Sequence, residues 1–115
     1  MNKYILIPAR LKSSRLPNKA LMKILNLPMI VHVALRAKFC KGIYKVVVCT
    51  DSSEICWECE KYNIDVCLTK SEHKNGTERI SEALNILGVQ NDDLVVDLQG
   101  DEVFVRPDDI DMVFH

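Results

Sequence analysis

Acidic residues are missing from the first 50 positions of this 115-residue sequence, where the first Asp or Glu is Asp51. Residues 1–50 carry ten Lys and Arg, a formal charge of +10, whereas residues 51–115 carry five Lys and Arg against sixteen acids, or −11. Such asymmetry is typical of nucleic-acid binding, or of one site with a phosphate-binding side and a metal-binding side. The cations are spread out and aromatic content is only 6%, which favours the single site and no nucleic acid.

Long apolar runs and secretion signals are also lacking. The longest uncharged stretch, from Ile24 to Leu35, is too short to span a bilayer and contains Pro28. Near the amino terminus, Pro8 ends an apolar run that is too short for a signal peptide. Five cysteines make an odd number, which does not suggest a disulfide framework. We therefore expect a cytoplasmic protein without a membrane partner.

A second pair of metal-ligand residues is missing beside the Cys-x-x-Cys motif of Cys56 and Cys59. A structural zinc site needs such a pair at suitable spacing. A redox motif needs its first cysteine at a helix amino terminus, which lowers the pKa of the thiol. Cys56 is predicted to lie inside a helix, so a structural role is favoured for both cysteines.

What the chain does contain is an alternation of strands and helices. Buried strands, apolar or β-branched as in a parallel sheet, are predicted at 3–9, 44–50, 64–69 and 93–98. Apolar residues at helical spacing predict one helix that starts at Pro28 and is ended by Gly42, and another that is capped by Thr77. A capping box of Asp51 and Glu54 predicts a helix between them that ends near Tyr62. A fourth is expected from Pro107. The alternation predicts an α/β, doubly wound, mostly parallel sheet in a single domain spanning 1–115, with ligands at the carboxyl ends of the strands.

The first strand leads into a basic loop, predicted at 10–27. Four cations, Arg10, Lys12, Arg15 and Lys19, follow Pro8 with no acid among them. Guanidinium groups pair bidentately with phosphate oxygens, and an ammonium group adds a point charge. Neither Gly-x-x-x-x-Gly-Lys-Ser/Thr nor Gly-x-Gly-x-x-Gly is present. The loop therefore predicts a polyphosphate site that is not a P-loop, and the alternative is a solvated basic loop.

Three motifs in order then carry a resemblance. They are Ile7-Pro8-Ala9-Arg10 with Ser13-Ser14-Arg15-Leu16-Pro17 and Lys19, then Gly76-Thr77-Glu78-Arg79, and then Gln99-Gly100-Asp101-Glu102. Together they resemble the CMP-sugar-acid synthetases, and most of all the CMP-Kdo synthetase (3-deoxy-manno-octulosonate cytidylyltransferase) family. The resemblance implies a Rossmann-like fold of the nucleotide-diphospho-sugar transferase type. It covers about half of a usual member, so the chain is expected to be a truncated form, the amino-terminal half of a longer cytidylyltransferase.

The resemblance also implies roles for individual residues. Arg10, Arg15, Lys19 and Asp101 would form the catalytic set, with the three cations on the triphosphate and Asp101 on Mg²⁺. Asp101 has chemistry that suits this metal, because Mg²⁺ prefers hard oxygen ligands and takes few protein carboxylates. The expected CTP-binding residues are Pro8, Ala9, Arg10, Arg15, Lys19, Asn75, Gly76, Thr77, Arg79 and Gln99. For the Gly76–Arg79 motif, the alternative is an ordinary helix start with Arg79 exposed.

The implied reaction joins CTP to 3-deoxy-manno-octulosonate (Kdo), giving CMP-Kdo and pyrophosphate for lipopolysaccharide biosynthesis. A CMP-sialic, legionaminic or pseudaminic acid synthetase is the alternative within the same chemistry. A non-catalytic nucleotide-binding fragment is the alternative outside it. The family's homodimer remains open, because its usual dimer-forming segment is expected in the half that this sequence does not include.

Overall fold

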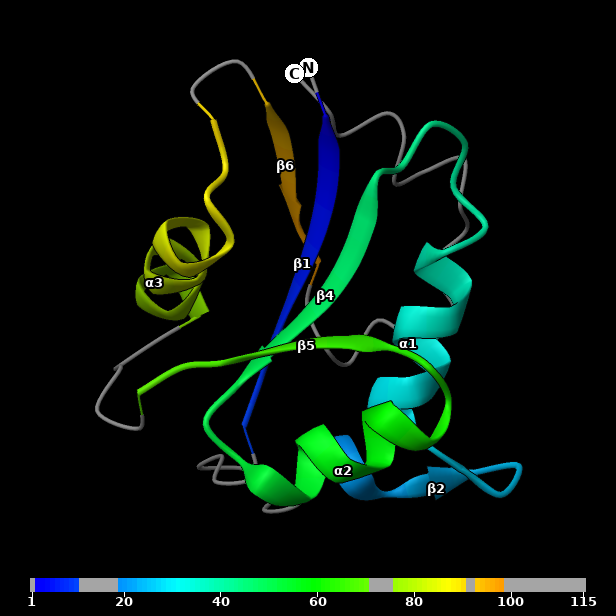
Figure 1. Ribbon diagram of the computed structural model, residues 1–115. Helices are drawn as coiled ribbons and strands as arrows, with labels where there is room; N and C mark the ends of the chain where they lie inside the picture. The colour runs from blue at the N-terminus through cyan, green and yellow to red at the C-terminus, as the bar shows by residue number, and fades with distance from the viewer. Residues whose placement is uncertain (1, 11–18, 71–75, 91–92, 99–115) are drawn as a thin grey trace.

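The computed structural model describes residues 2–10, 19–70, 76–90 and 93–98. Figure 1 shows a central sheet with helices packed on both sides of it. The elements in chain order are β1 (Lys3–Ala9), the 3-10 helix η1 (Lys19–Leu21), β2 (Lys23–Ile24), β3 (Leu27–Pro28), α1 (Met29–Ala37), β4 (Lys45–Thr50), α2 (Ser53–Lys61), β5 (Asp65–Leu68), α3 (Gly76–Leu87) and β6 (Leu94–Asp97).

The four predicted strands form one parallel sheet in the order β5-β4-β1-β6. Strand β1 lies at its centre, with Ile5 opposite Val46 of β4 on one side and Val96 of β6 on the other. The chain builds the sheet outward from β1 through β4 to β5, and then returns to the far side of β1 to form β6. The predicted doubly wound α/β fold is confirmed, and the reversal of strand order lies between β1 and β6.

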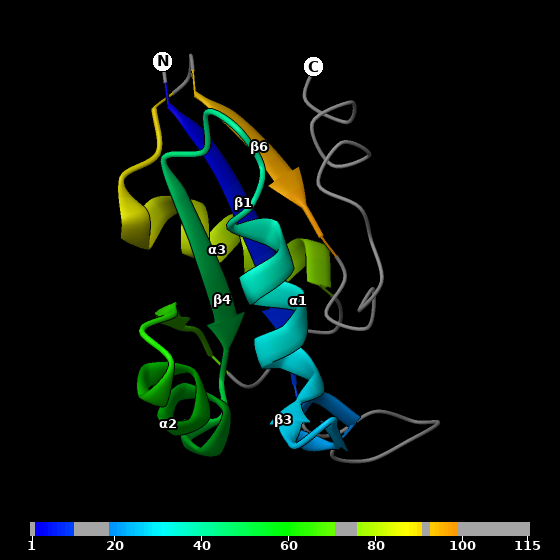
Figure 2. The same ribbon diagram turned by 90° about the vertical axis from the view of Figure 1, so that its right-hand side faces the viewer.

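The two faces of the sheet bury separate apolar clusters, as expected for parallel strands covered on both sides. Figure 2 shows α1 in front of the sheet and α3 behind it. On the first face, Ile5 and Ile7 pack with residues of α1 and α2, among them Ile30 and Ile55. On the second face, Leu6 belongs to a cluster to which α3 contributes Ile80 and Ala83; its other buried members are Tyr4, Val47, Cys49 and Cys67.

Helix α1 differs from its prediction at both ends. Pro28 precedes the helix as its N-cap, with an extended backbone, instead of occupying the first helical position. The helix ends at Ala37, well before Gly42. Gly42 has a φ of 73° and lies in the turn that leads to β4, so it serves that turn instead of ending the helix.

The predicted loop 10–27 contains regular structure that the sequence analysis missed. Besides η1, it includes a short antiparallel hairpin in which Lys23 pairs with Pro28 and Ile24 with Leu27. The two turn residues, Leu25 and Asn26, both have positive φ, as a two-residue hairpin turn of type I′ requires. The His32 Nε2 atom hydrogen-bonds the carbonyl of Ile24, so this histidine ties the hairpin to α1.

Helix α2 matches its predicted extent, but Asp51 is not its cap. Ser52 occupies the N-cap, and its hydroxyl accepts a hydrogen bond from the backbone N–H of Ile55 at 3.2 Å. Asp51 lies one residue too early for this geometry, and its carboxylate lies near Arg79 instead. The capping box predicted from Asp51 and Glu54 is therefore wrong, because the residue three positions after the actual cap is Ile55.

Helix α3 begins at Gly76, so Thr77 lies inside its first turn and is not the predicted cap. The predicted apolar stripe is confirmed, because Ile80 and Ala83 are buried and Leu84 and Leu87 pack against the same cluster. The helix predicted from Pro107 lies outside the described residues. Among the described ones, no helix is both long and apolar enough to cross a membrane.

Candidate functional site at the carboxyl edge of the sheet

The end of β1 carries the first predicted site residues. Leu6 directs its carbonyl toward β6, where it accepts from Leu98, and the β1–β6 pairing ends at Leu6 and Asp97. Since strand residues two apart face the same neighbour, the nitrogen of Pro8 points to the side where this ladder has ended. Proline therefore costs the central strand no hydrogen bond there. Pro8 and Ala9 are buried, and Arg10 emerges exposed at the edge.

Strand β6, which precedes the third motif in the sequence, ends at the same edge. The backbone N–H of Leu98 donates to the carbonyl of Leu6 at 3.0 Å. Gln99 follows Leu98 directly, while the chain after Ala9 continues into Arg10. The two motifs thus leave neighbouring parallel strands at the reversal of strand order, which is where open α/β sheets bind ligands.

Arg79 reaches this edge from α3, and it is buried with only 3% of its surface exposed. Its Nη1 atom donates to the Thr69 hydroxyl oxygen at 2.5 Å and to the Lys70 carbonyl at 3.1 Å. Asp51 Oδ1 lies 3.9 Å from the same atom. The alternative prediction that Arg79 is exposed is therefore wrong. The contact predicted between Arg79 and CTP stays a prediction.

The remaining predicted residues are described less fully. The backbone of Lys19 lies in η1, and the backbones of Gly76 and Thr77 form the first turn of α3. That turn directs backbone N–H groups away from the helix, as amino-terminal turns do. The other predicted site residues lie outside the described residues; they are Arg15, Asn75, Gln99 and Asp101.

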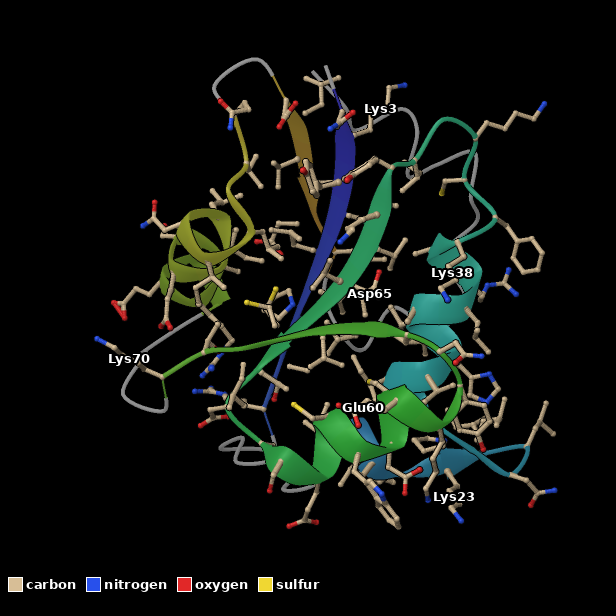
Figure 3. All side chains as sticks on the ribbon, in the orientation of Figure 1. Lys3, Lys23, Lys38, Glu60, Asp65 and Lys70 are labelled. Carbon is tan, nitrogen blue, oxygen red and sulfur yellow. The ribbon has the colours of Figure 1, made fainter. Side chains whose placement is uncertain are left out.

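Sequence reasoning missed three residues near this edge: Asp51, Thr69 and Glu82. Glu82 accepts a hydrogen bond from the backbone N–H of Lys70 at 3.0 Å, and Figure 3 shows Lys70 where the chain leaves β5 toward α3. Glu82 lies one helical turn after Arg79, so the two share one face of α3. The three-residue spacing of Arg79 and Glu82 was visible in the sequence, but the sequence did not show that both side chains bond the backbone of Lys70.

The Cys-x-x-Cys motif lacks the lowered thiol pKa of a reactive centre. Burial raises the pKa of the Cys59 thiol to about 12 and also raises the pKa of Cys56. A reactive Cys-x-x-Cys motif needs the opposite shift. Cys49 lies directly opposite Cys67 on the neighbouring strand, and burial raises the pKa of Cys49 to about 12. Within the described residues, no group of three or more His, Cys, Asp or Glu could hold a metal ion.

Comparison with known proteins agrees with this geometry. The model of the cytidylyltransferase family matches residues 4–115. The chain belongs to the cytidylyltransferase family. The chain spans 41% to 46% of the length of curated relatives that it matches.

Two curated cytidylyltransferases illustrate the similarity. The 3-deoxy-manno-octulosonate cytidylyltransferase of Acidovorax sp. (strain JS42) is 45% identical over 109 residues, which cover 95% of this chain and 41% of the relative. The 8-amino-3,8-dideoxy-manno-octulosonate cytidylyltransferase of Shewanella baltica (strain OS155 / ATCC BAA-1091) is 44% identical over 113 residues, covering 98% of this chain and 46% of the relative.

Solved structures show the same fold. A CMP:2-keto-3-deoxy-manno-octonic acid synthetase complexed with CTP superposes with a TM-score of 0.91 at 35% identity, over 98% of this chain and 46% of that one. A cytidylyltransferase from Leptospira borgpetersenii superposes with a TM-score of 0.80 at 25% identity, over 97% of this chain and 47% of that one. The doubly wound architecture is therefore that of the amino-terminal part of cytidylyltransferases.

Proposed function

We propose that this chain is the CTP-binding part of a cytidylyltransferase that couples CTP to Kdo, giving CMP-Kdo and pyrophosphate for lipopolysaccharide biosynthesis. One observation carries the proposal most strongly. The chain superposes on a synthetase complexed with CTP at a TM-score of 0.91, and β1 and β6, the strands that lead into the first and third motifs, are neighbours in its sheet. The five cysteines and the short, interrupted apolar stretches favour the cytoplasm.

In this proposal the basic loop holds the triphosphate. Arg10, Arg15 and Lys19 pair with phosphate oxygens, two as guanidinium forks and one as a point charge. The exposed position of Arg10 at the carboxyl end of β1 supports its part. Pro8 and Ala9 present backbone to the cytosine base. These contacts orient the α-phosphorus and stabilise the charge that gathers on phosphate oxygens during transfer.

The proposed contacts to the nucleoside end of CTP come from the start of α3 and from the third motif. Asn75, Gly76 and Thr77 are assigned to the cytosine and ribose, and Gln99 is assigned to CTP. A helix amino terminus offers free backbone N–H groups to polar acceptors. Arg79 belongs to the same motif, but its guanidinium is buried and bonded to protein oxygens.

Asp101 is the residue that would hold Mg²⁺. The chain reaches it four residues after Asp97, the last residue of β6, and a carboxylate at that edge is a hard oxygen ligand of the kind Mg²⁺ takes together with substrate phosphates. When bound, the metal supplies positive charge to the phosphate oxygens and orients them. The remaining positive charges come from the Arg and Lys side chains of the basic loop.

The reaction is a displacement at phosphorus. The anomeric hydroxyl oxygen of Kdo forms a bond to the α-phosphorus of CTP, the bond from that phosphorus to the bridging β-phosphate oxygen breaks, and the hydroxyl proton passes to solvent. Pyrophosphate leaves. No oxidant or further reactant is needed.

A second substrate is favoured by a specific observation. The 44% identity to an 8-amino-3,8-dideoxy-manno-octulosonate cytidylyltransferase is almost the same as the 45% identity to a Kdo cytidylyltransferase. The 8-amino sugar acid is therefore the second candidate acceptor. CMP-sialic, legionaminic or pseudaminic acid synthesis has no such relative among those described above.

The test is formation of CMP-sugar from CTP, Mg²⁺ and each sugar acid in turn, followed by chromatography and by pyrophosphate release. We expect product with Kdo, or with its 8-amino analogue, and none with N-acetylneuraminate. A larger rate with N-acetylneuraminate would contradict the substrate class. A folded chain that binds CTP and forms no product would instead be the non-catalytic nucleotide-binding fragment.

A further inference from the structure

Two side chains of α3 hold the backbone of Lys70 from both sides. The Lys70 N–H donates to Glu82 Oε1 at 3.0 Å, and the Lys70 carbonyl accepts from Arg79 Nη1 at 3.1 Å. Lys70 is the second residue after β5, so neither group belongs to the sheet ladder. We call these two hydrogen bonds the Lys70 clamp. The clamp joins the exit of β5 to the helix that follows it.

The clamp is anchored in the protein interior. Arg79 also donates to the hydroxyl of Thr69, and Thr69 itself is only 5% exposed. The backbone N–H of Thr69 donates to the carbonyl of Thr50 at 2.8 Å, which links this segment to the end of β4. Asp51, the next residue after Thr50, lies 3.9 Å from Arg79. One guanidinium thereby connects the ends of β4 and β5 with α3.

The burial of Arg79 decides between two roles. A ligand for a nucleotide must present its donors to the ligand, whereas this guanidinium is 3% exposed and its Nη1 already bonds two protein oxygens. A buried cation is tolerated only when it is paired and hydrogen-bonded, and losing one partner is costly. Moving Arg79 to reach CTP would break these bonds and leave Thr69 without its donor.

We propose that Arg79 and Glu82 are positioning residues, which fix the first turn of α3 against the ends of β4 and β5 and so set the selectivity for the cytosine nucleoside. This inference rests on the proposed function, in which Gly76 and Thr77 of that turn face the base and ribose. A turn held in place before the ligand arrives does not have to be ordered on binding. Loosening the clamp therefore weakens nucleoside recognition and leaves triphosphate recognition, which belongs to the basic loop, unchanged.

The experiment compares four test variants and one control variant with the unsubstituted chain. Glu82→Ala removes one side of the clamp, Glu82→Gln keeps an oxygen acceptor for Lys70, and Thr69→Val removes an anchor without touching α3. Arg79→Met removes the guanidinium at similar length. Ser81→Ala, on an exposed position of the same helix, is the matched control. Two readouts are taken: hydrogen exchange of the Lys70 amide, and the dissociation constants of CTP, UTP and inorganic tripolyphosphate.

We expect the Lys70 amide to exchange about 5-fold faster in Glu82→Ala, the effect of losing one net hydrogen bond, and at the original rate in Glu82→Gln and Ser81→Ala. The preference for CTP over UTP should fall about 5-fold in Glu82→Ala and Thr69→Val, with tripolyphosphate binding unchanged. Glu82→Gln should restore the preference.

The opposite pattern overturns the inference. If Arg79→Met loses CTP affinity while Glu82→Ala and Thr69→Val keep the full preference for CTP over UTP, Arg79 contacts the nucleotide directly. If the unsubstituted chain shows no preference for CTP, the proposed function fails and the selectivity role fails with it. Exchange at Lys70 distinguishes these cases, because it reports the clamp without any nucleotide.

Discussion

Leu98 donates its backbone N–H to the carbonyl of Leu6 at 3.0 Å. This hydrogen bond sets β6 beside β1, although the two residues are far apart in the sequence. The loop that starts at Arg10 and the motif that starts at Gln99 consequently leave adjacent strands at one edge of the sheet. A nucleotide bound at the proposed site must be reached by both segments, and the adjacency of β1 and β6 allows this.

Arg10→Ala should weaken CTP binding. In the proposed site this guanidinium makes a charge-assisted hydrogen bond to phosphate, worth about 1.5–3 kcal/mol, so the dissociation constant should rise about 10- to 100-fold. Lys41→Ala is the matched control, since Lys41 is exposed between α1 and β4, at the other edge of the sheet. An equal loss of CTP affinity in both variants would mean that only the overall charge of the protein matters for binding.

Much of the fold could be predicted because its signals are local. The apolar runs that form β1 and β4 have few alternatives to burial in a parallel sheet, and the stripe of Ile80, Ala83 and Leu84 can only face one side of a helix. The order of strands and helices then limits the topology strongly. The position of the site followed from the same order, since its motifs come at the ends of strands.

The errors arose where the outcome depends on distant partners or on fine geometry. The partners of Arg79 come from the segments that follow β4 and β5, and not from α3 itself, so its burial had no local signal. The β2–β3 hairpin places Leu25 at positive φ without any glycine in its turn, which the usual turn signals do not reveal. Asp51 and Ser52 are both good caps, and sequence alone did not choose between neighbours.

Ser52→Ala tests the corrected helix start. The Ser52 hydroxyl accepts from the Ile55 N–H, and removing an N-cap side chain lowers the free energy of unfolding by about 1 kcal/mol. Ser53→Ala, at the exposed first residue of α2, should change it by less than about 0.5 kcal/mol. Urea unfolding of the two variants measures both values. A larger loss for Ser53→Ala would place the cap elsewhere.

Cys56 should be the first cysteine to react with Ellman's reagent at pH 8. It is partly exposed, whereas the other four cysteines are buried, and burial also raises the pKa of thiols such as Cys49. We expect one thiol to react early in the folded protein, and the other four to react only after unfolding. The early reaction should disappear in Cys56→Ser, and its survival in that variant would show that another cysteine is accessible.

Asp93 should stabilise the fold at neutral pH and lose this effect in acid. Its carboxylate accepts from the backbone N–H groups of Asn2 and Gln90, each at 2.8 Å, and these bonds lower its pKa below the ordinary value of 3.8. A group whose pKa is lowered by folding adds stability above its ordinary pKa, and this is lost as pH falls through the folded value.

Asp93→Ala should therefore lower the urea midpoint at pH 7, and the gap from the unsubstituted chain should narrow below about pH 4. Glu60→Gln, which removes one negative charge on the exposed part of α2, is the control. A gap that widens in acid would contradict the assigned hydrogen bonds.

The central claim is that this edge of the sheet selects CTP. Its most direct measurement is a calorimetric titration of the chain with CTP in the presence of Mg²⁺, with ATP and GTP as comparisons and Arg15→Ala as the loss variant. We expect CTP to bind more tightly than either purine nucleotide, with a dissociation constant about 10-fold or more higher in Arg15→Ala. A folded chain that binds no CTP, or that binds all three nucleotides equally, would contradict the account.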